Sequence, residues 1–180
     1  MRQYKKLRMF LHAQALPVSP TTPDPELADD ELVAFIRFGN DFTDNFYQVE
    51  MPLKLSNYGN QSPENIWLAD NEIDVSLSLL TALKSKKIAN TLSPPDENGI
   101  YFLNELDLGS SRDRLNIGIK GNPNFGLVRT LMIGVKNKSG QIKRGEVWFN
   151  ELRMSDMDNK GGYAAIANLD TNLADFATVS

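Results

Sequence analysis

Few residues in this 180-residue chain have the types and spacing that chemistry needs. The chain contains no cysteine and a single histidine, His12. Thiolate catalysis, cysteine-ligated zinc and a histidine-rich metal site are therefore excluded, and a Ser-His-Asp triad is disfavoured. We expect a protein that is not an enzyme.

Two acidic clusters carry the oxygen ligands that Ca²⁺ prefers. One cluster, 29–31, follows a proline-rich segment, and the other contains Asp156 and Asp158. Neither completes an EF-hand loop, and acidic turns are common on protein surfaces. We keep Asp156 and Asp158 as candidate ligands of a structural calcium, with a solvated turn as the alternative, and expect no other cofactor.

Aromatic residues offer a second kind of site. Trp67 and Tyr58 are the candidate binding residues, because exposed rings stack against sugars and are enriched where proteins meet. Trp148 and Tyr101 are further candidates for such a platform, but Trp148 stands between two apolar residues and is expected in the core. His12 lies on the polar side of its strand, where we expect a surface or hydrogen-bonded side chain.

The overall composition narrows the class of partner. The chain has 19 basic and 23 acidic side chains, a formal net charge of -4 and a pI near 5.0. Because the longest basic cluster is 84–87, nucleic-acid binding is disfavoured. No apolar run approaches the roughly eighteen residues of a membrane helix. A membrane β-strand, whose alternating signal is weak, is not excluded.

The elements that must position these residues are mainly strands. Apolar and polar residues alternate with a period of two in several segments, which polar turns separate. The predicted strands are 4–14, 31–38, 47–55, 114–120, 127–136 and 146–153. Leu79, Leu80 and Leu83 share a helical face before a lysine cluster. The pattern predicts an antiparallel β-sandwich, jelly-roll-like and similar to galactose-binding or carbohydrate-binding modules, with one short helix.

The last part of the chain has a different pattern. Residues 1–158 form the predicted sandwich domain. In 159–180, small or apolar residues such as Ala165 and Leu169 alternate with polar ones such as Asn168 and Asp170. This pattern fits an edge strand of the sandwich and also resembles the start of an outer-membrane barrel strand. We expect the chain to be a fragment of a longer protein.

Specific stretches of the sequence are also familiar. The run 145–156, continued through 158–165 to 173–176, resembles the SprA (Sov) family of cell-surface and gliding-motility proteins of Bacteroidota. Further similar stretches are 35–39 with Asp41, 47–53, 71–74, 119–124 and 128–135. The resemblance therefore spans nearly the whole chain.

This resemblance implies a function within a much longer protein. Members of the family are very long chains whose outer-membrane barrel is the translocon of the type IX secretion system, which exports proteins and supports gliding. It implies a non-catalytic soluble domain, periplasmic or extracellular, in a protein of the Gram-negative outer membrane and cell surface. The implied partners are the remaining barrel, a PorV-type outer-membrane protein, a plug protein and exported proteins. The alternative is a free-standing carbohydrate-binding or adhesin-type β-sandwich.

Overall fold

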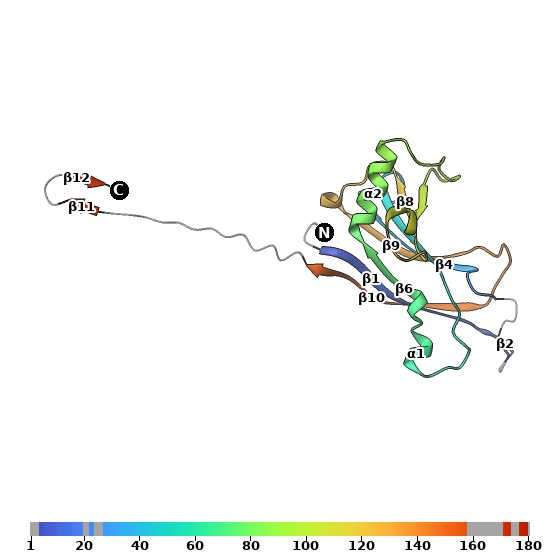
Figure 1. The fold of residues 1–180 in the computed structure, drawn as a ribbon. Helices are drawn as coiled ribbons and strands as arrows, with labels where there is room; N and C mark the ends of the chain where they lie inside the picture. Colours follow the sequence, from blue (N-terminus) through green and yellow to red (C-terminus); the bar gives the residue numbers. More distant parts are fainter. Residues whose placement is uncertain (1–3, 20–21, 24–26, 158–170, 174–176, 180) are drawn as a thin grey trace.

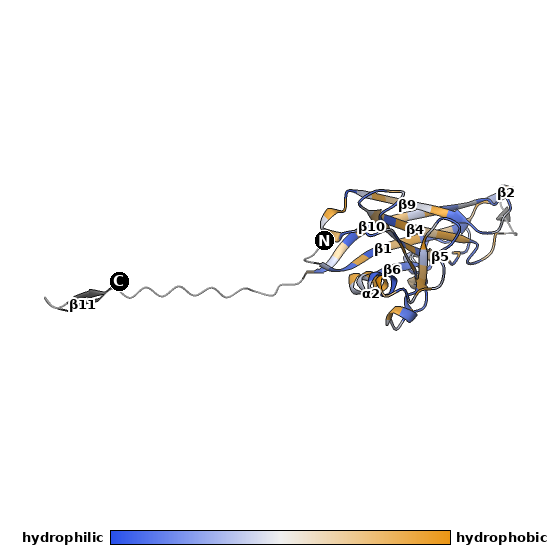
Figure 2. Cartoon of the chain, turned by 90° about the horizontal axis from the view of Figure 1, so that it is seen from above, coloured by the Kyte–Doolittle hydropathy of each residue, from blue (hydrophilic) through white to orange (hydrophobic). Residues whose placement is uncertain are grey.

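The computed structural model describes residues 4–19, 22–23, 27–157, 171–173 and 177–179. Strand β1 (Tyr4–Ala15) shows why the chain forms a sandwich. Its odd-numbered residues from Leu7 to Ala15 are buried, whereas Arg8 and Phe10 on the opposite face are partly exposed. Figure 2 shows the resulting alternation of apolar and polar residues along β1. One face of the strand therefore belongs to the core.

The smaller sheet has β1 at its centre. Strands β10 (Gly145–Met157) and β6 (Glu72–Ser76) pair antiparallel with β1 on either side, in the order β10-β1-β6 (Figure 1). The register of β10 shifts opposite Met9, where Glu151 adopts a φ of 53°. This β-bulge interrupts an otherwise regular pairing.

The larger sheet has five strands, all antiparallel. Their spatial order is β7 (Tyr101–Asn104), β8 (Asn116–Lys120), β5 (Phe46–Pro52), β4 (Leu32–Gly39) and β9 (Thr130–Asn137). The core between the two sheets includes Ile36 and Phe38 of β4, Val49 of β5 and Ile117 of β8, all fully buried. The predicted antiparallel β-sandwich is confirmed.

The predicted helix is also present. Helix α2 (Leu77–Ile88) buries Leu79, Leu80 and Leu83 and packs on β8, β1 and β6. Shorter helical turns, which the sequence did not predict, are α1 (Pro63–Ile66), η1 (Ala69–Asn71), η2 (Leu106–Leu108) and η3 (Phe125–Leu127). Lys84 donates to the carbonyl of Pro123 at 2.8 Å, and Lys87 donates to that of Gly121. These lysines therefore hold the loop before η3 against the helix.

Some boundaries differ from the prediction. The expected loop after β1 contains a short ribbon, β2 (Pro17–Ser19) paired with β3 (Thr22–Pro23). Strand β9 begins three residues later than predicted because 125–127 forms the turn η3. In the tail, β11 (Thr171–Leu173) pairs with β12 (Ala177–Val179). Most of the predicted barrel-like strand in 159–180 lies outside the described residues. Within the described part, no helix is long and apolar enough to cross a membrane.

Candidate functional site

The outer face of the smaller sheet carries His12 at its centre. His12 is only 1% exposed, and its Nδ1 lies 2.9 Å from the carbonyl oxygen of Ile66 and 3.2 Å from Ser56 Oγ. A carbonyl oxygen can only accept, so Nδ1 carries the proton. Nε2 is buried without a hydrogen-bond partner among the described residues. The predicted hydrogen-bonded histidine is thus found, in a buried setting.

Two tryptophans surround this histidine. Trp148 of β10 lies directly opposite His12, with ring centroids 4.5 Å apart. Trp67, which follows α1, lies 6.2 Å from His12 and 6.3 Å from Trp148. We call these three residues the aromatic cluster. Because the two indole planes are inclined at 56°, they do not form one flat platform.

The exposure of Trp148 corrects a prediction. We expected Trp148 in the core, but 45% of its surface is exposed. Its neighbours Val147 and Phe149 pair with Ala13 and Leu11 and pack against the core. Since successive side chains of a strand point to opposite faces, Trp148 must face outward.

The predicted pair Trp67 and Tyr58 is not brought together. Tyr58 is an exposed turn residue, and no ring contact in the described part of the chain joins it to Trp67. Tyr101 lies in β7 under the ammonium group of Lys87, 5.3 Å away. The binding roles of Trp67 and Tyr58 remain predictions, and Trp148 is the exposed ring beside Trp67.

Paired charges continue the same face beyond the aromatic cluster. Arg8 binds Glu72, and Lys6 Nζ lies 3.1 Å from Asp74. The hydrogen bond and the negative charge of Glu72 raise the pKa of Arg8 above its usual value. The ring of Phe10 lies 6.0 Å from the Arg8 guanidinium and 5.8 Å from that of Arg153. This arrangement of rings and guanidinium groups is suited to contact with another protein.

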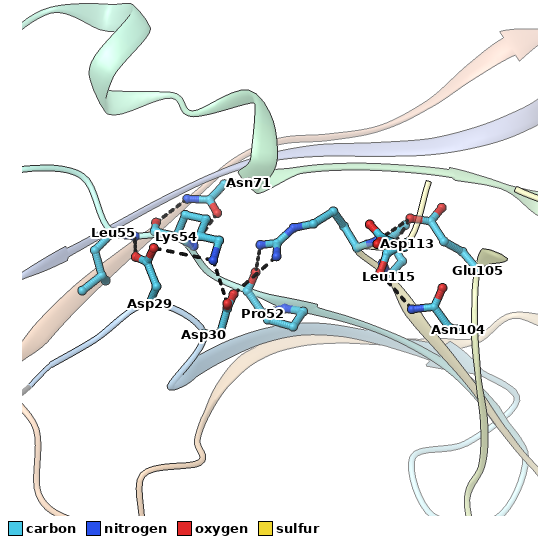
Figure 3. Close-up of polar contacts among 11 residues, drawn as sticks. Asp29, Asp30, Pro52, Lys54, Leu55, Asn71, Asn104, Glu105, Asp113 and Leu115 are labelled. Atoms are coloured by element: carbon cyan, nitrogen blue, oxygen red, sulfur yellow. Dashed lines mark hydrogen bonds and ion pairs between the residues drawn. The ribbon is translucent and has the colours of Figure 1, made fainter. Parts of the chain in front are cut away.

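Asp29 and Asp30 of the acidic cluster 29–31 are bound by the chain's own cations (Figure 3). Lys54 Nζ lies 2.7 Å from Asp30 and 3.6 Å from Asp29. Arg114 approaches Asp30 to 3.4 Å. Burial opposes ionisation of Asp30, but the hydrogen bonds and charges of Lys54 and Arg114 outweigh it and lower the pKa. These carboxylates therefore fasten a loop to the sandwich.

The same close-up shows a buried acid that sequence analysis missed. Glu105 is 1% exposed, and its Oε1 accepts from the backbone N–H groups of Arg114 and Leu115 at 3.1 Å each. Its Oε2 accepts from Ser110 Oγ at 2.9 Å. A lone glutamate in a turn carries no spacing signal, so only its position in the fold reveals it. The hydrogen bonds of Glu105 hold together the connection between β7 and β8 (Figure 3).

The candidate calcium ligands are only partly described. Asp156 is exposed, 4.0 Å from Lys6 Nζ, and has a φ of 57°. Asp158 lies outside the described residues. Across the described part, no group of three or more histidine or acidic side chains is placed to hold a metal ion. The structural calcium remains a prediction.

Comparison with known protein families gives a match. A family model described as a motility related/secretion protein, SprA_N, matches residues 1–180, which is the whole chain. No curated protein sequence matches the chain.

Proposed function

This chain belongs to the SprA_N family of motility-related and secretion proteins, and from that premise we propose that it is a non-catalytic domain of an outer-membrane protein translocon. The system would be type IX secretion, in which the full protein exports other proteins and supports gliding. The observation that carries the proposal is the family match over all 180 residues. The domain would lie at the outer membrane or cell surface, on its periplasmic or extracellular side.

Three acidic groups support a contact role over a catalytic one. Glu105 is saturated by backbone donors, and Asp30 is bound by Lys54 and Arg114. Glu50, which is also buried, accepts from Gln48 at 2.5 Å and binds Lys136. A general acid or base must reach a substrate proton, whereas these carboxylates are committed to holding strands and loops.

The outer face of the smaller sheet supplies the contact surface. Tryptophan and arginine dominate the binding energy of many protein interfaces, and this face exposes Trp148 and Arg153. The rigid sandwich would present this face to the rest of the barrel, a PorV-type protein, a plug protein or an exported protein. Binding would proceed without bond-breaking chemistry.

The experiment uses the full-length protein in the bacterium that encodes it. Trp148→Ala should reduce protein export and spreading, because an exposed anchor residue is lost without a loss of core packing. Ile142→Ala, in the exposed loop between β9 and β10, is the matched control and should leave both unchanged. An in-frame deletion of 4–157 should abolish export.

Each strain has an outcome that counts against the proposal. Normal export in the deletion strain would refute the role in secretion. Normal export in the Trp148→Ala strain, with loss in the deletion strain, would refute this particular contact surface. Immunoblotting of the outer-membrane fraction checks that every variant is present at the wild-type level.

Glycan binding is a second candidate function. The observation that favours it is the exposed ring of Trp148 beside Trp67, since aromatic side chains stack against sugar rings. A glycan array probed with the 180-residue chain should then show binding that Trp148→Ala or Trp67→Ala removes. Phe42→Ala is the control, because Phe42 is an exposed ring in the loop between β4 and β5 and makes no ring contact with the aromatic cluster in the described part of the chain. A silent array would reject this candidate.

A further inference from the structure

The sandwich has four sheet edges, and three of them are poor templates for another strand. The edges are β6 and β10 in the smaller sheet and β7 and β9 in the larger. Strands β6 and β7 have only five and four residues. Strand β10 is interrupted by its bulge, and both Glu151 and Asp156 have positive φ. Short strands and bulges are the usual devices that prevent edge pairing.

Strand β9 lacks these devices. All eight of its residues pair with β4 in a continuous register, from Thr130 opposite Gly39 to Asn137 opposite Leu32. Its other edge pairs with no strand in the described part of the chain. The strand contains no proline, and its one charged residue is Lys136. A regular, unbroken edge of this length is a template for pairing.

Lys136 does not block the pairing of another strand at this edge. Its Nζ binds Glu50 of β5, across β4 on the outer face of the larger sheet. The same ammonium group lies 5.8 Å from the ring centroids of both Phe35 and Phe102. The lysine that could have projected into solvent is therefore directed back over the sheet.

The inner face of β9 is apolar and incompletely covered. Leu131, Ile133 and Val135 are 46%, 42% and 40% exposed. Their partners on β4, which are Phe38, Ile36 and Ala34, are fully buried. The smaller sheet has three strands against five and leaves these three side chains partly uncovered. An added strand beside β9 would cover them.

The charges at the two ends of β9 indicate which strand fits. Arg129 precedes β9 and Lys138 follows it, both are exposed, and neither side chain has a hydrogen bond or ion pair to any described residue. Two copies pairing about a two-fold axis at the centre of β9 would place Arg129 of one opposite Lys138 of the other. Like charges directly opposite destabilise a strand pair. A segment with acidic ends is favoured instead.

We propose that β9 accepts an extended segment of a partner protein as a sixth strand of the larger sheet. The segment would be apolar on the side that faces the core and would carry acidic residues at both ends, opposite Arg129 and Lys138. Backbone hydrogen bonds would provide affinity, and the flanking charges would select the sequence. This inference rests on β9 alone and does not require a role in protein export.

The test uses the 180-residue chain and two synthetic peptides as long as β9 with its flanks. Both peptides alternate valine with threonine; one has aspartate pairs at its ends and the other has lysine pairs. Fluorescence anisotropy at low salt should show that the acidic peptide binds about tenfold more tightly. Hydrogen exchange should slow at β9 amides, and the preference should weaken as salt rises.

A charge reversal makes the test specific. The double variant Arg129→Glu with Lys138→Glu should prefer the lysine peptide. The control Lys86→Glu with Lys120→Glu changes the net charge equally, but lies on α2 and β8, and should keep the original preference. Circular dichroism confirms that both variants are folded.

Four results would overturn the proposal. Three are equal binding of the two peptides, absence of binding by both, and protection at β10 in place of β9. The fourth is protection of β9 by self-association without peptide, which would identify a second copy as the occupant. None of these results bears on the export phenotype that tests the proposed function.

Discussion

Replacing Glu105 by alanine is expected to destabilise the chain strongly. The carboxylate accepts from two backbone amides and one hydroxyl, and Leu115, which supplies one of these amides, is fully buried. Alanine leaves these donors without their acceptor. An unsatisfied buried donor costs about 1–3 kcal/mol, so losing two amide partners should cost about 2–6 kcal/mol.

That loss is a large fraction of the roughly 5–15 kcal/mol that stabilises a domain of ordinary size. Urea unfolding followed by tryptophan fluorescence measures it, with the m-value as a check that the unfolded state is unchanged. Glu105→Gln keeps an oxygen for the two amides and should lose less than half as much. Glu97→Ala, at an exposed turn residue, is the control and should cost less than about 0.5 kcal/mol. A cost below about 1 kcal/mol for Glu105→Ala would refute the reasoning, because buried amides would then be satisfied in some other way.

Further measurements test other parts of the fold. Hydrogen bonds from the backbone N–H groups of Asp44 and Asn45 hold the pKa of Asp41 far below its usual value. The stability that this carboxylate contributes should therefore be complete above about pH 5 and be lost as the pH decreases. Asp41→Asn should flatten this decline in urea unfolding between pH 2 and 4, where the unfolded carboxyl takes up a proton and the folded one does not. Burial raises the pKa of Tyr47 to about 12. Because the tyrosine of the unfolded chain loses its proton at a lower pH, stability should fall above about pH 10. Tyr47→Phe should reduce this decline. Gly39→Ala should cost about 1–3 kcal/mol in thermal unfolding, because the new Cβ would lie 2.3 Å from a backbone carbonyl oxygen. A melting temperature unchanged by Gly39→Ala would contradict that explanation.

Local patterns predicted most of the strands correctly. The alternation in β1 and β5 is visible in the sequence because a buried face and a polar face repeat every two residues. Even so, both faces of β5 are buried in the structure, since Gln48 and Glu50 lie under the Arg37 and Lys136 side chains on the outer face. The helical face of α2 was equally clear from its leucines.

The candidate site was predicted less well. Trp67 was singled out as part of an aromatic group with Tyr58, and its ring neighbours in the structure are His12 and Trp148, which come from opposite parts of the chain. Tyr58 is closer in sequence and yet makes no ring contact with Trp67 among the described residues. Strand pairing between β1 and β10 brings these rings together, and no local pattern encodes that pairing.

By itself, the sequence determined the class of the fold, the core faces of the strands and the family, because these depend on local periodicity and on recognisable stretches of residues. The tertiary structure decided which strands became neighbours. Pairing across long separations placed Trp148 outside the core, surrounded Glu105 with buried amides and left the apolar face of β9 partly uncovered. Each of these features depends on which distant segment lies alongside, and residue spacing along the chain carries no information about that choice.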